Sequence, residues 1–121
     1  MFTISKTFTF SASHRLEGLA EDHPCSRLHG HNYSVTVTIQ SPVLSEVGFV
    51  KDYRSLDWIK QTIDETYDHR HLNDLLVFNP TAELLAKCFF DLFQPRFGAP
   101  VKLKSVTVKE TDKTSATYDE A

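Results

Sequence analysis

Residues 23–40, HPCSRLHGHNYSVTVTIQ, combine a strand pattern with a group of reactive side chains. Apolar residues alternate with polar ones at positions 33, 35, 37 and 39, which is typical of a β-strand with one buried face. Extending this strand backward places His29 and His31 on the same buried face. Cys25 lies shortly before them in a polar segment. The stretch therefore predicts a strand that begins at a cluster of chemically reactive side chains.

The N-terminal segment predicts a second strand of the same kind. In FTISKTFTF, residues 2–10, the apolar residues fall at even positions and the odd positions are Thr or Ser. Continuing this strand past Phe10 places Ala12 and His14 on its buried face. If the two strands pair antiparallel across a loop of residues 15–28, the end of the first lies beside the start of the second. We therefore expect His14, His29 and His31 to converge.

Three convergent neutral imidazoles are typical of a catalytic zinc site, in which a fourth position stays open for water or substrate. A bound zinc ion would acidify a hydroxyl group and polarise a carbonyl group. The alternative is that His29-Gly30-His31 forms a turn whose histidines make local hydrogen bonds, which is the commoner meaning of an isolated His-x-His. The expected proximity of His14 favours the metal site.

Cys25 allows three interpretations. It could be a fourth ligand that closes the zinc site and makes it structural. It could instead be a thiolate beside the metal, acting as base or nucleophile with a pKa lowered by nearby positive charge. The third interpretation, a small buried apolar residue, suits Cys88 on its helix better than Cys25 in its polar loop.

A second polar cluster, YDHRHLND, occupies residues 67–74. Asp68 could orient His69 and fix its tautomer, which would make a proton relay with a cysteine distant in sequence. The alternative is a solvated helix end, where a histidine is favoured by the helix dipole. His23 and His71 are expected at the surface.

The remaining pattern predicts two helices and two more strands. The first helix begins after a possible cap at Asp52; the second begins at NPTAE, where Asn79 could cap it, and ends at Pro95. Residues 101–110 predict a third strand with a bulge near Ser105, and residues 111–118 a fourth. Glu110 shares the buried face of the third strand, where it could accept two N–H groups of an aminopyrimidinone ring; the alternative is a solvated strand end.

Length and composition indicate one α+β domain over residues 1–121. With 40% hydrophobic residues, 24% charged residues and a formal charge of −3, the chain lacks the basic excess of nucleic-acid-binding proteins. Its alternating N-terminus resembles neither a signal peptide nor a membrane span. We therefore expect a cytoplasmic protein, with no nucleic-acid or membrane partner and with Cys25 and Cys88 as free thiols.

Five segments, in order and at matching spacing, resemble the 6-pyruvoyltetrahydropterin synthase/6-carboxytetrahydropterin synthase family: FTFSASHRL, CSRLHGHNY, DHRHLND, NPTAE and VKET. Together they span nearly the whole chain. The resemblance implies the tunnelling fold, a four-stranded antiparallel sheet with two helices packed on one face. It also implies trimers that close these sheets into a barrel and stack as homohexamers, with active sites between subunits.

The resemblance also implies roles for individual residues. His14, His29 and His31 match the zinc ligands, and Cys25 matches the catalytic cysteine. Asp68 and His69 match its relay partners, and Glu110 matches the residue that anchors the pterin. Further candidates for contacts with the substrate are Thr81 in NPTAE and, for the triphosphate, Arg15, Arg27 and Lys109.

Spacing within the motif favours one branch of the family. Three residues separate Cys25 from His29, as in bacterial enzymes of the queuosine pathway, whereas pyruvoyl-forming members typically have five. The implied reaction is conversion of 7,8-dihydroneopterin triphosphate to 6-carboxy-5,6,7,8-tetrahydropterin, with release of acetaldehyde and triphosphate. A pyruvoyl-type synthase and a non-catalytic zinc-stabilised oligomeric module remain alternatives. The chain departs from the family pattern at Tyr67, where leucine is usual, and in its last hairpin, where the Thr-Ser pair falls one residue late.

Overall fold

A long antiparallel hairpin organises the fold. The computed structural model describes residues 1–120; residue 121, the last of the expected domain, lies outside the described part. Strand β1 (Phe2–His14) pairs with β2 (His29–Ser41) along its whole length, from Phe2 opposite Ser41 to His14 opposite His29. The alternating sequence sets this pairing, because a slip of one residue in either strand would turn the apolar face of that strand toward solvent.

Two further strands extend the sheet on the β2 side. Strand β4 (Lys102–Thr111) pairs antiparallel with β2, and β5 (Thr114–Asp119) pairs antiparallel with β4. The β2–β4 pairing shifts between Thr38 and Ile39, where Lys104 is the extra residue, so the bulge expected near Ser105 is confirmed.

The sheet has five strands in the order β3-β1-β2-β4-β5, not the four antiparallel strands that we expected. The additional strand is β3 (Arg70–His71), which runs parallel to β1 at its free edge. It is held there because the Asp68 carboxylate accepts from Ser11 N–H at 2.9 Å and His69 N–H donates to Ser11 C=O at 2.6 Å. A strand of two residues has no periodicity that a sequence pattern could show.

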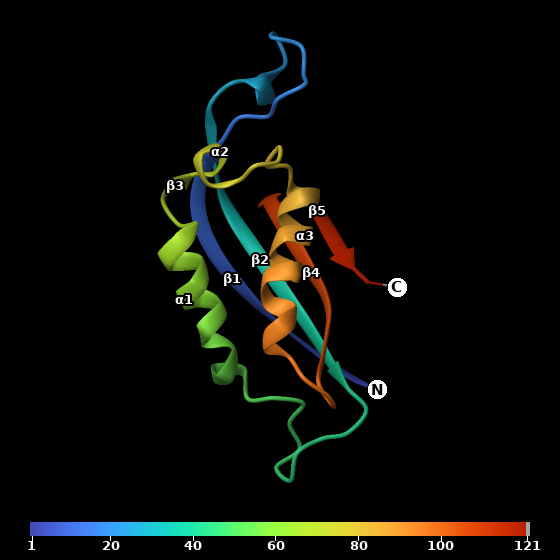
Figure 1. Ribbon diagram of the computed structural model, residues 1–121. Helices are drawn as coiled ribbons and strands as arrows, with labels where there is room; N and C mark the ends of the chain where they lie inside the picture. The colour runs from blue at the N-terminus through green and yellow to red at the C-terminus, as the bar shows by residue number, and fades with distance from the viewer. Residues whose placement is uncertain (121) are drawn as a thin grey trace.

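The helices cover one face of the sheet (Figure 1). Helix α1 (Asp57–Thr66) follows a 3₁₀ turn (Tyr53–Leu56) that the Asp52 side chain caps, and α3 (Ala82–Phe93) precedes a 3₁₀ turn (Gln94–Arg96). A third, short helix that we did not expect is α2 (Leu72–Leu75). The cap of α3 is Thr81, whose hydroxyl accepts from Leu84 N–H, and not Asn79.

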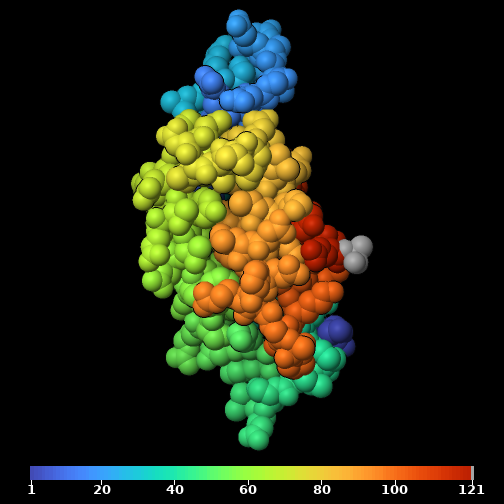
Figure 2. Space-filling view, viewed as in Figure 1, coloured from blue at the N-terminus to red at the C-terminus, as the bar shows by residue number. Residues whose placement is uncertain are grey.

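The core lies between this sheet face and helices α1 and α3. It contains the inward residues of β1, β2 and β4 and an aromatic cluster in which Phe89 contacts Phe10, Tyr67 and Phe93 at ring-centroid distances of 5.0–6.0 Å. None of the helices in residues 1–120 is long and apolar enough to cross a membrane. The loop of residues 15–28 projects beyond this body next to the segment around residues 70–80 (Figures 1 and 2).

Candidate functional site

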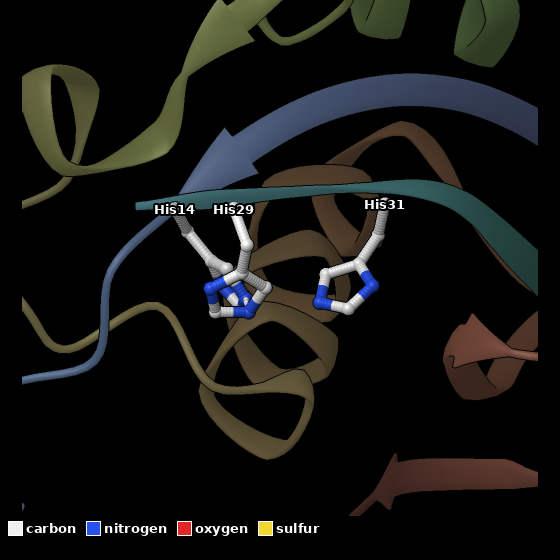
Figure 3. A group of neighbouring side chains, drawn as sticks. All are labelled: His14, His29 and His31. Atoms are coloured by element: carbon white, nitrogen blue, oxygen red, sulfur yellow. Dashed lines mark hydrogen bonds between the residues drawn. The ribbon is translucent and has the colours of Figure 1, made fainter. Parts of the chain in front are cut away.

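Three histidines converge where β1 ends and β2 begins (Figure 3). His14 lies directly opposite His29 in the strand pairing, and His31 lies opposite Ala12 on the same face. One ring nitrogen from each side chain lies within 4.8 Å of the others. His14 is fully buried, and the other two are partly buried. The convergence expected from strand parity is confirmed.

Backbone carbonyl groups fix the orientation of two of these rings. The Nδ1 atom of His14 lies 2.8 Å from the Pro80 carbonyl oxygen, and that of His29 lies 2.7 Å from the Arg27 carbonyl oxygen. A carbonyl oxygen can only accept, so each Nδ1 carries the hydrogen. In the neutral imidazole the other nitrogen, Nε2, then presents a lone pair. This is the arrangement in which histidine binds a metal ion.

Two features at the centre of this group favour the binding of a cation. The Nε2 atoms of His14 and His29 lie 2.9 Å apart, and with both Nδ1 atoms protonated these are two acceptors that face each other. The Nε2 atom of His31 is the single buried side-chain nitrogen or oxygen within residues 1–120 that has no hydrogen-bond partner. A metal ion between the rings would satisfy all three nitrogens, so this group could hold one.

The surroundings favour the neutral forms of His14 and His31. Burial lowers the pKa of His14; the Pro80 carbonyl group opposes this effect, and the neighbouring histidines add to it. Burial, followed by the charge of His29, also lowers the pKa of His31. A metal ion competes with protons for imidazole nitrogen, so a lowered pKa favours metal binding.

Glu110 extends the site toward the end of β4. Its Oε2 atom lies 3.7 Å from Nε2 of His31, and burial raises the pKa of its carboxyl group. Glu110 lines a cavity of about 500 Å³ together with Thr81 and Glu83 at the start of α3 and residues 114–117 of β5. A half-buried carboxylate beside the histidines can thus contact a ligand that occupies this cavity.

Asp68 and His69 form the expected pair, but on the outer edge of β1. Asp68 Oδ2 lies 2.9 Å from His69 Nδ1, while Oδ1 accepts from Ser11 N–H. These contacts, the Ser11 hydrogen bond first, lower the pKa of Asp68. The His69 backbone has a φ of 57°, and its side chain is 81% exposed. The pair is therefore held at this edge by hydrogen bonds to Ser11, and the His69 ring is open to a partner.

Cys25 stands apart from both groups. It lies in a 3₁₀ turn, Pro24–Ser26, where its N–H donates to His23 Nδ1 and its C=O accepts from Leu16 N–H. It does not belong to the group of possible metal ligands among residues 1–120, so the geometry gives no support to a closed four-ligand site. Within the same described part, no hydrogen bond joins Cys25 to Asp68 or His69.

The other expected contact residues are more scattered. Arg15 and Arg27 are exposed in the loop that carries Cys25, and Lys109 is exposed on the sheet face away from the helices. Thr81 caps α3 and lines the cavity beside Glu110.

His71, expected at the surface, is half-buried instead, with Nδ1 3.0 Å from the Ser13 hydroxyl oxygen. It was misplaced because nothing in the sequence marks the short strand β3 that carries it. Sequence reasoning also missed the contacts of Asn73 and Asn79, which side-chain spacing along the chain does not encode.

Fold and site together define an α+β protein with a candidate metal centre at the end of its central hairpin. The chain belongs to the 6-pyruvoyl tetrahydropterin synthase family, whose model matches residues 3–121. It is 30% identical to 6-carboxy-5,6,7,8-tetrahydropterin synthase from Aquifex aeolicus, with 97% of each sequence covered.

Solved structures show the same likeness. The 6-pyruvoyl tetrahydropterin synthase of Caenorhabditis elegans superposes with a TM-score of 0.84 at 30% identity, covering 99% of this chain and 96% of that one. An uncharacterized protein from Wolinella succinogenes superposes with a TM-score of 0.87 at 26% identity, covering 99% of this chain and 98% of that one. The expected α+β tunnelling-fold architecture is thereby confirmed at the level of the subunit.

Proposed function

We propose that the protein is a zinc-dependent 6-carboxy-5,6,7,8-tetrahydropterin synthase of queuosine biosynthesis. It would convert 7,8-dihydroneopterin triphosphate to 6-carboxytetrahydropterin and release acetaldehyde and triphosphate. The observation that carries this proposal is the histidine triad, with its facing acceptor nitrogens, beside the half-buried Glu110. Family membership and the name of the Aquifex relative support the choice of substrate class.

Zinc suits the ligand set because it accepts three imidazole nitrogens and keeps a fourth position open. Once bound, it would polarise side-chain oxygens of the substrate and stabilise negative charge that develops there. The Pro80 and Arg27 carbonyl groups hold His14 and His29 in the tautomer that such binding requires.

Glu110 would anchor the pterin, because two carboxylate oxygens can accept the two adjacent N–H groups of the ring together. Thr81 would line the same cavity. Arg15 and Arg27, which lie on the exposed loop that carries Cys25, would neutralise part of the triphosphate. Lys109 lies on the sheet face opposite Glu110, so it would contact only a substrate bound by another subunit. Cys25 would move a proton on the substrate side chain.

His69, oriented by Asp68, would be the relay partner of Cys25 from a neighbouring subunit. Two observations support this arrangement: His69 is 81% exposed, and no hydrogen bond joins it to Cys25 within residues 1–120 of one chain. The uncovered edge at β5 also suits closure of the sheet between subunits. We propose a homohexamer, a dimer of trimers. Light scattering that gave a monomer at micromolar concentration would contradict it.

Mixing experiments test the shared site directly. Cys25→Ala and His69→Ala should each be nearly inactive as pure assemblies. Co-refolding the two variants should restore part of the activity, because some sites then receive an intact cysteine from one subunit and an intact histidine from another. No recovery in assemblies shown to be mixed would place both groups in the same subunit's site.

Product identification by mass spectrometry tests the reaction itself. After incubation with 7,8-dihydroneopterin triphosphate, we expect 6-carboxytetrahydropterin and acetaldehyde. A pyruvoyltetrahydropterin product would favour the second candidate, to which the Caenorhabditis elegans relative gives its name. Bound zinc with no turnover of this substrate would favour the non-catalytic module.

A further inference from the structure

Two asparagines make the same unusual contact with the loop that follows His14. Asn73 accepts from Arg15 N–H and donates to Arg15 C=O, both at 2.8 Å. Asn79 accepts from Glu17 N–H at 2.9 Å and donates to Glu17 C=O at 3.1 Å. A side-chain amide carries one acceptor and one donor group, so each asparagine substitutes for a neighbouring strand at one residue.

The residue between these two contacts connects to Cys25. Leu16 N–H donates to the Cys25 carbonyl oxygen at 2.8 Å. In an extended segment, backbone groups of successive residues point to opposite sides. Residues 15 and 17 therefore face the asparagines, while residue 16 faces Cys25.

The same contacts reach the metal centre. The pairing of β1 with β2 ends at His14 opposite His29, so residues 15–17 lie beyond the last pair of that hairpin. Asn79 precedes Pro80, whose carbonyl group orients His14. Residues 79–80 thus hold both the ring of His14 and the backbone that leads from it toward Cys25.

We propose that Asn73 and Asn79 are positioning residues that fix the Cys25 loop relative to the histidine triad. They hold residues 15–17 against α2 and the segment between α2 and α3. The hydrogen bond from Leu16 N–H to the Cys25 carbonyl oxygen then fixes the position of Cys25. The catalytic consequence rests on the proposed function, whereas the structural clamp does not depend on it.

Hydrogen exchange at the Leu16 amide tests the clamp without reference to activity. This amide donates to Cys25 and the asparagines bind the residues on either side of it, so its exchange reports whether the link to Cys25 survives when a neighbouring residue is released. We expect Asn73→Ala and Asn79→Ala each to speed exchange at Leu16 about tenfold. Amides of Val35 and Val37, in the centre of the hairpin, should keep their protection. Unchanged exchange at Leu16 in both variants would overturn the proposal.

Conservative variants separate positioning from loss of fold. Asn73→Asp keeps the oxygen that accepts from Arg15 N–H. It replaces the NH₂ group that donates to Arg15 C=O by a carboxylate oxygen, so that hydrogen bond is lost. Its exchange at Leu16 should fall between wild type and Asn73→Ala. The matched control is Gln40→Glu, the same change of amide to carboxylate near the far end of β2. It should leave exchange at Leu16 unchanged, and an equal effect in the control would refute a specific clamp.

Kinetics test the catalytic consequence. Displacing Cys25 should lower kcat about tenfold, while the Kd for a pterin without the triphosphate should stay within about twofold, because the Glu110 anchor is untouched. Faster exchange at Leu16 with unchanged kcat would show that the clamp does not serve catalysis. Absence of turnover in the wild-type protein would refute the proposed function instead, and the exchange result would still decide on the clamp.

Discussion

Replacing His31 by alanine should separate the stability of the metal-free fold from the stability that metal binding adds. In the metal-free protein His31 carries a buried, unpartnered Nε2, and its side chain is 18% exposed. Removing that nitrogen recovers about 1–3 kcal/mol of desolvation cost. Removing the ring loses about 1–3 kcal/mol of apolar burial. The two effects oppose each other, so the metal-free variant should unfold within about 1–2 kcal/mol of wild type.

Zinc should raise the Tm of the wild-type protein much more than that of His31→Ala. At a free zinc concentration about a hundredfold above Kd, a single site stabilises the folded state by about 2.7 kcal/mol. For a chain of 121 residues this corresponds to a rise in Tm of roughly 10 °C. His31→Ala retains two of the three candidate ligands and should show little of this rise.

Calorimetry with chelator and then with excess zinc measures both effects, at one subunit concentration for all proteins. Cys25→Ala is the control, because Cys25 lies outside the group of possible ligands. It should keep the full zinc-dependent rise in Tm and the wild-type metal content. A full rise in His31→Ala, or its loss in Cys25→Ala, would refute an open three-histidine site.

Three further predictions concern pH, packing and substrate binding. Because folding lowers the pKa values of His14 and His31, their contribution to the free energy of unfolding is fully present above pH 6.5 and is lost as the pH falls through the pKa values of the folded state. A free energy of unfolding of the metal-free protein that does not change from pH 7 to pH 5 would contradict this. Phe89→Ala should cost about 3–5 kcal/mol in urea unfolding, and the exposed Leu92→Ala less than about 1 kcal/mol; equal losses would contradict the core assignment. Glu110→Gln should weaken substrate binding roughly 5- to 150-fold, because an amide offers one acceptor where two donors are expected; an unchanged substrate Kd would remove Glu110 as the anchor.

The course of the main chain could be predicted in large part from local patterns. Alternation in residues 2–10 and 33–39 gives the two long strands and the face that each one buries. Because strand parity extends beyond the apolar residues, it also predicts that His14, His29 and His31 lie together. Family resemblance supplied the catalytic roles, which remain proposals.

Other features depend on how segments distant in sequence dock against one another. Strand β3 forms because Ser11 binds Asp68 and His69, and Thr81 rather than Asn79 caps α3 because the Asn79 amide pairs with Glu17. The sequence of these segments has no periodicity from which the contacts of Ser11 and of Asn79 could be predicted.

The chemistry of the histidine triad shows the same division. The sequence places three imidazoles on one face, but it does not say which nitrogen of each ring carries the hydrogen. That is set by carbonyl groups, and for His14 the carbonyl belongs to Pro80, 66 residues away. Side-chain periodicity is a local property of the chain and determines which residues share a face. Hydrogen-bond partners are chosen only when the loops, helices and sheet have packed, so the tautomers and the placement of Cys25 are decided by the tertiary structure.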